Sequence, residues 1–130
     1  MVTWQFATTE EFLPICDLFT SSEIGSKDFY EIERRIAIPL LLRQLITFYE
    51  NNKLSGFVSF AFLNNDAEKH IPTVGILPDD WRSGKNFWVI DLVTKGDGYR
   101  MMRAAARGLK LKKWRYFRHK NQQIKELRAI

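Results

Sequence analysis

The sequence predicts an α/β protein whose central sheet is mixed, mainly antiparallel and flanked by helices. Two stretches of the chain carry this prediction. Residues 45–49 and 56–62 are β-forming runs separated by a turn-like segment, which predicts an antiparallel hairpin. Residues 87–94 form an apolar strand that is followed by a glycine turn, a helix from about Tyr99 and a strand at 114–119. Such a strand–helix–strand crossover predicts one parallel pair, so the sheet should be mixed.

The N-terminal segment predicts a strand and then a helix. Residues 2–6 alternate polar and apolar side chains, as a short strand does. Thr8 and Glu11 have the spacing of a capping box, which should open a helix that runs to about Phe19. With 130 residues the chain can bury one core of ordinary size, so we expect a single domain over residues 1–130.

A second helix should begin near Asp28, a residue type that caps helices. On it Glu31 and Arg35 stand one turn apart, which favours an ion pair between them. Pro39 should end or bend this helix because proline has no backbone N–H to donate. Residues 64–81 are less regular, with prolines and a glycine that mark turns.

Charge is distributed unevenly along the chain. The net charge is +5, but residues 1–98 hold nine Lys/Arg and fourteen Asp/Glu, a net −5. Residues 99–130 hold eleven Lys/Arg and only Glu126, a net +10. A basic block of this kind attracts anionic partners, which include nucleic acid, an anionic membrane and an acidic protein.

The helix from Tyr99 combines a basic face with an apolar one. Met102, Ala105, Ala106 and Leu109 recur on one side, which should face the core. The opposite side carries four cations: Arg100, Arg103, Arg107 and Lys110. Residues 112–119 then interleave cations with aromatic side chains, as nucleic-acid binders do. The alternative is a solvated basic face whose aromatic side chains turn into the core.

No targeting segment or metal motif is recognisable. The N-terminus lacks the basic and apolar regions of a secretory signal, and no apolar run approaches the roughly 20 residues that span a bilayer. We therefore expect a soluble cytoplasmic protein. His70 and His119 stand near no Cys, His or carboxylate at a metal-ligand spacing, so no metal site is predicted.

Asp91 is the most unusual residue of the predicted sheet, because it lies between Ile90 and Leu92 in an apolar strand. An unpartnered buried charge costs about several kcal/mol, so this carboxylate must be ion-paired, hydrogen-bonded or chemically active. In the chemical interpretation it serves as a general base or as the group that orients one. The other interpretation is a structural aspartate that accepts backbone hydrogen bonds from a neighbouring loop.

The turn after this strand is a candidate anion site. Gly96 and Gly98 would let backbone N–H groups approach a phosphate at the start of the following helix. Lys95, Arg100 and Arg103 would add positive charge there. In the structural interpretation, Asp97 simply caps that helix.

Residues 79–91, DDWRSGKNFWVID, together with the KGDG turn at 95–98 and with Tyr99, Met102 and Arg103, resemble the core signature of the RTX toxin-activating lysine acyltransferases. The aromatic hairpin, Pro39 and the pair Ser21–Ser22 fall in the same order at compatible spacings. The similarity covers roughly residues 18–120, and the chain ends soon after its last predicted strand, short of the family's C-terminal region.

The resemblance implies a GNAT-like acyltransferase fold, often dimeric, that moves a fatty acyl group from acyl carrier protein to a lysine ε-amine of a protoxin. No permanently bound cofactor is implied, and acyl-CoA is a second possible donor. The family's catalytic aspartate and serine fall on Asp91 and Ser22. The family's histidine position falls on Gly25, which cannot transfer a proton.

Three functions remain open at this point. The chain could be a divergent acyltransferase whose basic C-terminal block docks an acidic acyl carrier protein or the phosphates of coenzyme A. It could be an inactive interaction module of the same fold, for example a phage virion component or a modulator of a host protein. It could also bind nucleic acid through its basic surface.

Overall fold

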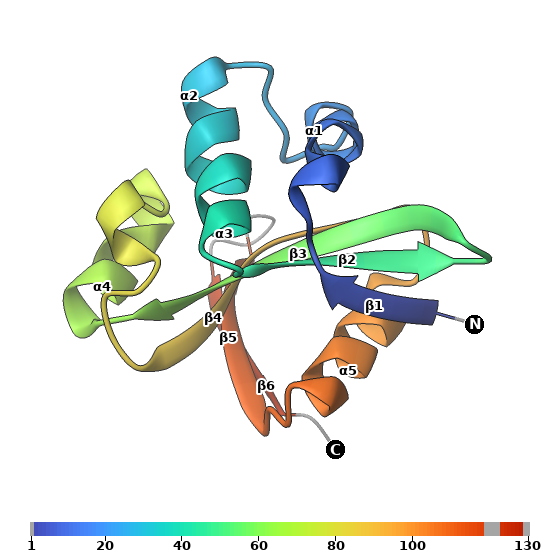
Figure 1. Ribbon diagram of the computed structural model, residues 1–130. Coiled ribbons are helices and arrows are strands. Elements are labelled where there is room, and N and C mark those ends of the chain that lie inside the picture. The colour runs from blue at the N-terminus through green and yellow to red at the C-terminus, as the bar shows by residue number, and fades with distance from the viewer. Residues whose placement is uncertain (1, 119–122, 129–130) are drawn as a thin grey trace.

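The computed structural model describes residues 2–118 and 123–128, and its centre is a six-stranded sheet (Figure 1). The strands lie side by side in the order of the sequence: β1 (Val2–Phe6), β2 (Leu45–Glu50), β3 (Lys53–Leu63), β4 (Asn86–Thr94), β5 (Lys113–Arg118) and β6 (Gln123–Arg128). All neighbouring strands pair antiparallel except β4 and β5, which are parallel. The predicted mixed, mainly antiparallel sheet is therefore confirmed.

Helices cover both faces of this sheet. The α-helices are α1 (Phe12–Thr20), α2 (Phe29–Ile32), α3 (Ile38–Leu41), α4 (Asn65–Val74) and α5 (Gly98–Gly108). In Figure 1, α1, α2 and α3 lie above the sheet, α5 lies below it, and α4 stands beside the far end of β3. Within the described residues, no helix is both long and apolar enough to cross a bilayer.

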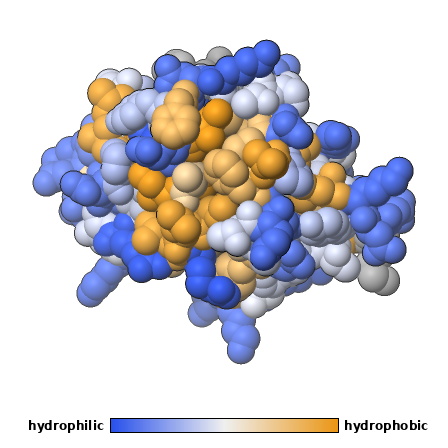
Figure 2. Space-filling view, turned by 45° about the horizontal axis from the view of Figure 1, so that its top comes forward, coloured by the Kyte–Doolittle hydropathy of each residue, from blue (hydrophilic) through white to orange (hydrophobic). Residues whose placement is uncertain are grey.

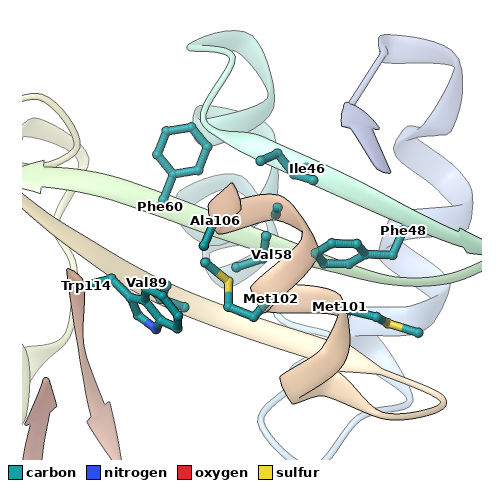
Figure 3. Packing of buried hydrophobic residues seen from close by; sticks show 10 residues of the cluster. Ile46, Phe48, Val58, Phe60, Val89, Met101, Met102, Ala106 and Trp114 are labelled. Atoms are coloured by element: carbon teal, nitrogen blue, oxygen red, sulfur yellow. The ribbon is translucent and has the colours of Figure 1, made fainter. Parts of the chain in front are cut away.

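The apolar face of α5 fastens the lower side of the sheet. Met101, Met102, Ala105 and Ala106 are all buried, which confirms the predicted inward face and adds Met101 to it. Figure 3 shows these side chains against residues of β2, β3, β4 and β5: Ile46, Phe48, Val58, Phe60, Val89 and Trp114. This packing holds β4, and the turn that follows it, in a fixed position.

The N-terminal capping box is confirmed. The backbone N–H of Thr8 donates to Glu11 Oε1 over 2.9 Å, and a 3₁₀ turn at Thr9–Glu11 leads into α1. Glu11 also accepts hydrogen bonds from Gln5 and from the hydroxyl of Tyr49. Burial alone would raise the pKa of Glu11, but these hydrogen bonds outweigh it and lower the pKa, while the same contact raises the pKa of Tyr49 to about 12.

The second helix begins as predicted but does not end at Pro39. The Asp28 side chain caps α2 by accepting from the N–H of Tyr30 and of Glu31. A π-helical turn, Glu33–Ala37, then joins α2 to α3, and Pro39 lies in the first turn of α3, where a missing N–H costs little. The chain thus stays helical to Leu41.

The segment predicted as irregular contains a helix. Asn64 caps α4 by accepting from the N–H of Ala67 over 2.8 Å, and Pro72 is tolerated inside the helix near its end. Gly75 ends α4 with a positive φ of 75°, a conformation that favours glycine. A 3₁₀ turn at Pro78–Asp80 follows. Strand β6 is also an addition to the predicted elements.

The helical face of the molecule carries exposed apolar side chains. Figure 2, in which the upper face of Figure 1 comes forward, shows hydrophobic residues gathered over its middle. Leu13 of α1, Phe29 of α2 and Leu41 of α3 are largely exposed. This face is therefore less polar than the surface of α5, which carries the arginines.

Candidate functional site

The central strand β4 is irregular at the point where Asp91 stands. Ser59 of β3 pairs with Asp91 and the next residue, Phe60, pairs with Val89, so Ile90 is an extra residue with no partner on β3. A bulge of this kind re-aims the neighbouring side chains. The backbone N–H of Asp91 donates to Ser59 Oγ over 3.1 Å, which fixes the strand on one side of the bulge.

On its other side β4 separates from β5. The two strands pair at a single position, Trp88 with Arg115, within residues 2–118 and 123–128. Beyond Trp88 the edge of β4 that faces β5 is therefore open. This opening lies between the bulge and the glycine turn at the end of the strand.

A cavity of about 320 Å³ lies over this part of β4. Four segments form its walls: the loop between α1 and α2, the helical run that contains the π turn, the end of α4 with the residues after it, and β4 itself. The lining residues are Glu23, Ile24, Arg34, Arg35, Ile71, Gly75, Ile76, Trp88, Val89, Ile90 and Asp91. The cavity is thus mainly apolar, with a few charged groups that converge on it, as is usual for a ligand site.

Asp91 is only 4% exposed and is held by Arg35. The Nε of Arg35 donates to Asp91 Oδ2 over 2.9 Å and Nη2 donates to Oδ1 over 2.8 Å, a bidentate ion pair. The guanidinium also lies 4.8 Å from the centre of the Phe19 ring. Burial lowers the pKa of Arg35, but the hydrogen bond and the charge of Asp91 outweigh it and raise the pKa. Of the expected partners for the buried aspartate, the structure shows a cation and not a loop backbone.

The predicted pairing of Glu31 with Arg35 is wrong, and the π turn explains why. The π turn, Glu33–Ala37, contains both arginines, and its wider i→i+5 hydrogen bonding shifts their side chains away from an α-helical register. Arg34 therefore pairs with Glu31 and also donates to the carbonyl of Ile76 over 2.5 Å. Arg34 thereby fixes the wall of the cavity that follows α4, and Arg35 is left to reach Asp91.

Ser22 and Gly25 lie in the loop beside the cavity. The hydroxyl of Ser22 donates to the carbonyl of Phe19 over 2.7 Å and so caps the end of α1. Ser22 does not line the cavity, and its predicted catalytic role stays a prediction. A Cβ at Gly25 would lie 1.6 Å from the carbonyl oxygen of Phe19, so this loop conformation leaves no room for a side chain at the position of the family's histidine.

The glycine turn at residues 95–98 has the structure expected if Asp97 caps the helix that follows it. The Asp97 side chain accepts from the backbone N–H of Arg100 over 3.1 Å and caps α5. Neither Gly96 nor Gly98 has a positive φ, and the space above Gly96 meets only Glu50 Oε2 and Met101 Cε, each at about 3.5 Å or more. The turn is therefore open on its outer side.

The predicted anion-binding residues gather at this turn and not at the cavity. Lys95 and Gly96 are exposed, and Gly98 is half-buried against Thr94. Arg100 pairs with Glu50 over 2.8 Å, and Arg103 lies over the ring of Tyr99. None of these five predicted residues lines the cavity that contains Asp91. Their role in binding a donor stays a prediction.

The histidines add no metal centre to the part of the chain that is described. No group of three or more His, Cys, Asp or Glu in it could hold a metal ion. His70 lies in α4, with Nε2 2.6 Å from Asp80 Oδ2. His119 lies outside the described residues.

Two aromatic residues of the C-terminal basic block, Trp114 and Tyr116, pack against the core. Trp114 is buried, and Tyr116 packs against the same core cluster beneath α5. Arg107 and Lys112, two cations of the same region, are exposed. This arrangement favours the solvated basic face over a base-stacking platform.

Two residues of the site could not be named from the sequence. The first is Arg35, the cation that pairs with the buried carboxylate of Asp91. Helical spacing had suggested that Arg35 pairs with Glu31 instead. Glu23 lines the cavity from a loop, and loop residues carry no periodicity that would place them.

Solved structures similar to this chain include GNAT family acetyltransferases and a GNATL domain. A GNAT family acetyltransferase from Streptococcus agalactiae matches with a TM-score of 0.63 and 14% identity, over 92% of this chain and 78% of that one. The loading GNATL domain of CurA from Lyngbya majuscula matches with a TM-score of 0.59 and 12% identity, over 90% of this chain and 64% of that one. A GNAT family acetyltransferase from Brucella melitensis, in complex with acetyl-CoA, matches with a TM-score of 0.51 and 11% identity, over 91% of this chain and 76% of that one.

These structural similarities establish the GNAT-like fold. The chain spans less than two thirds of the CurA domain and 37% of a second acetyltransferase, from Pyrococcus horikoshii. No curated protein sequence matches the chain significantly. The family model described as the RTX toxin acyltransferase family, HlyC, matches residues 6–129, which is nearly the whole sequence. The chain therefore belongs to the RTX toxin acyltransferase family.

Proposed function

We propose that this protein transfers a fatty acyl group from the thioester of acyl carrier protein to a lysine ε-amine of a target protein. The observation that carries the proposal is the cavity over the bulge of β4, where the buried Arg35–Asp91 pair faces apolar walls beside an open strand edge. Membership in the acyltransferase family supports the same reaction class.

The open edge of β4 offers a path for the donor. A phosphopantetheine arm, which acyl carrier protein and coenzyme A share, is long and thin, and it ends in a thioester. The path along β4 from Asp91 to the strand's end at Thr94 is about 10 Å at the usual rise per residue. We assign the phosphate end to the turn with Lys95 and Gly96, and the thioester to the cavity. The complex of the Brucella relative with acetyl-CoA supports a donor of this kind.

The reaction requires stabilisation of the negative charge that develops on the thioester oxygen. Backbone N–H groups on the open edge of β4 and the guanidinium of Arg35 are the donors near the cavity. Two of the five N–H groups of Arg35 bind Asp91, which leaves three for a ligand. In this proposal Asp91 is a positioning residue, because it fixes the orientation and charge of Arg35.

Transfer can be tested with defined donors. The protein is incubated with an RTX protoxin fragment and either palmitoyl-acyl carrier protein or palmitoyl-CoA. Lysine acylation is read from the intact mass, and thiol release is read in parallel. We expect acylation that Asp91→Asn abolishes, whereas Asp66→Asn, which changes an exposed carboxylate on α4, leaves it unchanged. Far-UV circular dichroism checks that both variants are folded. An unmodified fragment and no thiol release with either donor would contradict the proposal.

A second candidate is an interaction module of the same fold without catalysis. The absence of room for a side chain at Gly25 favours it, because the family's histidine cannot be restored there without a change of the loop. This function predicts that the wild-type protein binds a partner but releases no thiol in the same assay. The two candidates are thus separated by the wild-type protein alone.

A further inference from the structure

The proposed transfer needs a group that takes a proton from the attacking amine, and Asp91 is badly placed for it. Both of its carboxylate oxygens accept from Arg35, and Asp91 is nearly closed to solvent. Gly25 has no side chain and no space for one. The proton acceptor of the cavity must therefore lie elsewhere on its walls.

Glu23 is the other carboxylate that lines the cavity. It is exposed, and it has no hydrogen-bond or ion-pair partner among the residues that the structure describes. The two cations of the lining are already engaged, Arg35 by Asp91 and Arg34 by Glu31 and the carbonyl of Ile76. Glu23 is therefore the one carboxylate of the cavity lining whose oxygens are free to accept a proton.

The loop that carries Glu23 is held in place on both sides of it. The N–H of Ser22 donates to the carbonyl of Phe19, and the N–H of Gly25 donates to the carbonyl of Ser22 over 3.2 Å. The hydroxyl of Ser22 adds a third bond to the end of α1. This turn depends on the missing side chain at Gly25, because a Cβ there would collide with Phe19. The feature that removes the family's histidine thus also positions Glu23.

We propose that Glu23 is the general base of the acyl transfer, an inference that rests on the function proposed above. The neutral lysine amine attacks the thioester carbonyl carbon, and a carbon–nitrogen bond forms. The nitrogen then gives its proton to the Glu23 carboxylate. The carbon–sulfur bond breaks, and the leaving thiolate takes the proton from the Glu23 carboxylic acid. The products are an amide and a thiol, and Glu23 returns to its starting state.

The test compares Glu23→Gln with the wild type in steady-state acylation of the protoxin fragment. General base catalysis by a positioned side chain contributes about 10²- to 10⁴-fold, so kcat should fall within that range. The KM for the acyl donor should stay within about threefold, because the donor binds along β4. Glu23→Asp should retain an intermediate rate. Glu10→Gln is the matched control, since Glu10 is exposed and lines a different hollow of the surface.

The pH profile separates a base from a group that only binds the amine. The acidic limb of the wild-type kcat profile against pH should be absent from the profile of Glu23→Gln. The thermal midpoint of Glu23→Gln should match that of the wild type, because an exposed residue without a partner adds little stability.

Each outcome decides one question. If the wild type acylates lysine while Glu23→Gln keeps kcat within threefold and the same pH profile, Glu23 is not the base and the proposed function stands. If the substitution raises only the KM for the protoxin fragment, Glu23 binds the acceptor and the base assignment is wrong. If the wild type neither acylates the fragment nor releases thiol, the proposed function fails, and this inference fails with it.

Discussion

At the scale of single residues, the ion pair between Arg35 and Asp91 should dominate the stability of the site. Removal of one partner leaves an uncompensated buried charge, which costs about 3–5 kcal/mol. We expect Asp91→Asn and Arg35→Gln each to lower the free energy of unfolding by about 3 kcal/mol, since Arg35 is partly solvated and also loses its contact with Phe19. The double variant should lose clearly less than the sum. Urea denaturation of the four proteins measures this coupling.

If the losses in unfolding free energy of the two single variants sum to that of the double variant within about 0.5 kcal/mol, Arg35 and Asp91 do not interact in solution. The same denaturation measurement is a control for the acylation assay, because it shows whether Asp91→Asn loses activity while folded or because it unfolds. A variant that stays folded at the assay temperature and fails to transfer supports a positioning role for Asp91.

The sequence predicted that Asp91 is paired or chemically active, because an unpartnered carboxylate in an apolar strand has a large desolvation cost. It did not predict the cation, because the assignment of Arg35 to Glu31 assumed 3.6 residues per turn, and the π turn breaks that period. Gly25 was recognised as a departure from the family, but the collision with the Phe19 carbonyl depends on the path of the loop. Residues that meet through irregular backbone are the ones that a periodic pattern cannot pair.

At the scale of elements, Glu68 of α4 joins the two strands that separate at the site. Its Oε2 accepts from the indole N–H of Trp88 on β4 over 2.6 Å and from Arg115 on β5 over 2.8 Å. Glu68→Ala would leave the buried indole N–H unsatisfied, so the free energy of unfolding should fall by about 1–3 kcal/mol. Amide hydrogen exchange in β5 should accelerate more than exchange in β2 and β3.

Asp66→Ala is the control for this substitution, since Asp66 is an exposed carboxylate in the same helix. Unchanged exchange in β5 of Glu68→Ala would mean that backbone pairing alone holds β5 beside β4. That outcome would also show that α4 does not affect the width of the opening between β4 and β5.

Helices and strands with a clear pattern of apolar residues were predicted from the sequence, whereas α4 and β6, which lack such a pattern, were not. The hairpin strands and β4 are apolar β-forming runs, of which β3 is buried on both faces, and α5 has one apolar face at helical spacing. The helix α4 was missed because Pro72, Gly75 and Pro78 all mark turns, although Pro72 fits near the end of a helix and Gly75 ends it. Strand β6 carries few apolar residues, and it pairs with β5 through backbone hydrogen bonds and an ion pair between Arg115 and Glu126.

At the scale of the whole molecule, charge separates the two functional surfaces. The mainly apolar cavity lies between β4, the α1–α2 loop, the π turn and the end of α4, whereas the exposed cations of α5 and the residues after it lie below the sheet in Figure 1. These cations are Arg100, Arg107, Lys110, Lys112 and Lys113. In the proposed reaction, the target protein approaches the cavity and the acidic donor protein docks at the basic surface.

This arrangement predicts electrostatic steering of acyl carrier protein. Complementary surface charges raise association rates by about 10- to 10³-fold at low salt, and the gain is lost as salt screens the charges. We expect the association rate of palmitoyl-acyl carrier protein, measured by stopped flow, to fall steeply between low and high salt. Arg107→Glu on α5 should lower the low-salt rate, whereas Lys69→Glu, the same kind of charge reversal on α4, should leave it nearly unchanged. Equal effects of the two reversals would show that only the net charge matters.

Binding of duplex DNA tests the remaining alternative, that the basic surface binds nucleic acid. A lower Kd for DNA than for acyl carrier protein, with a steep salt dependence that Arg107→Glu reduces, would assign the basic surface to nucleic acid instead.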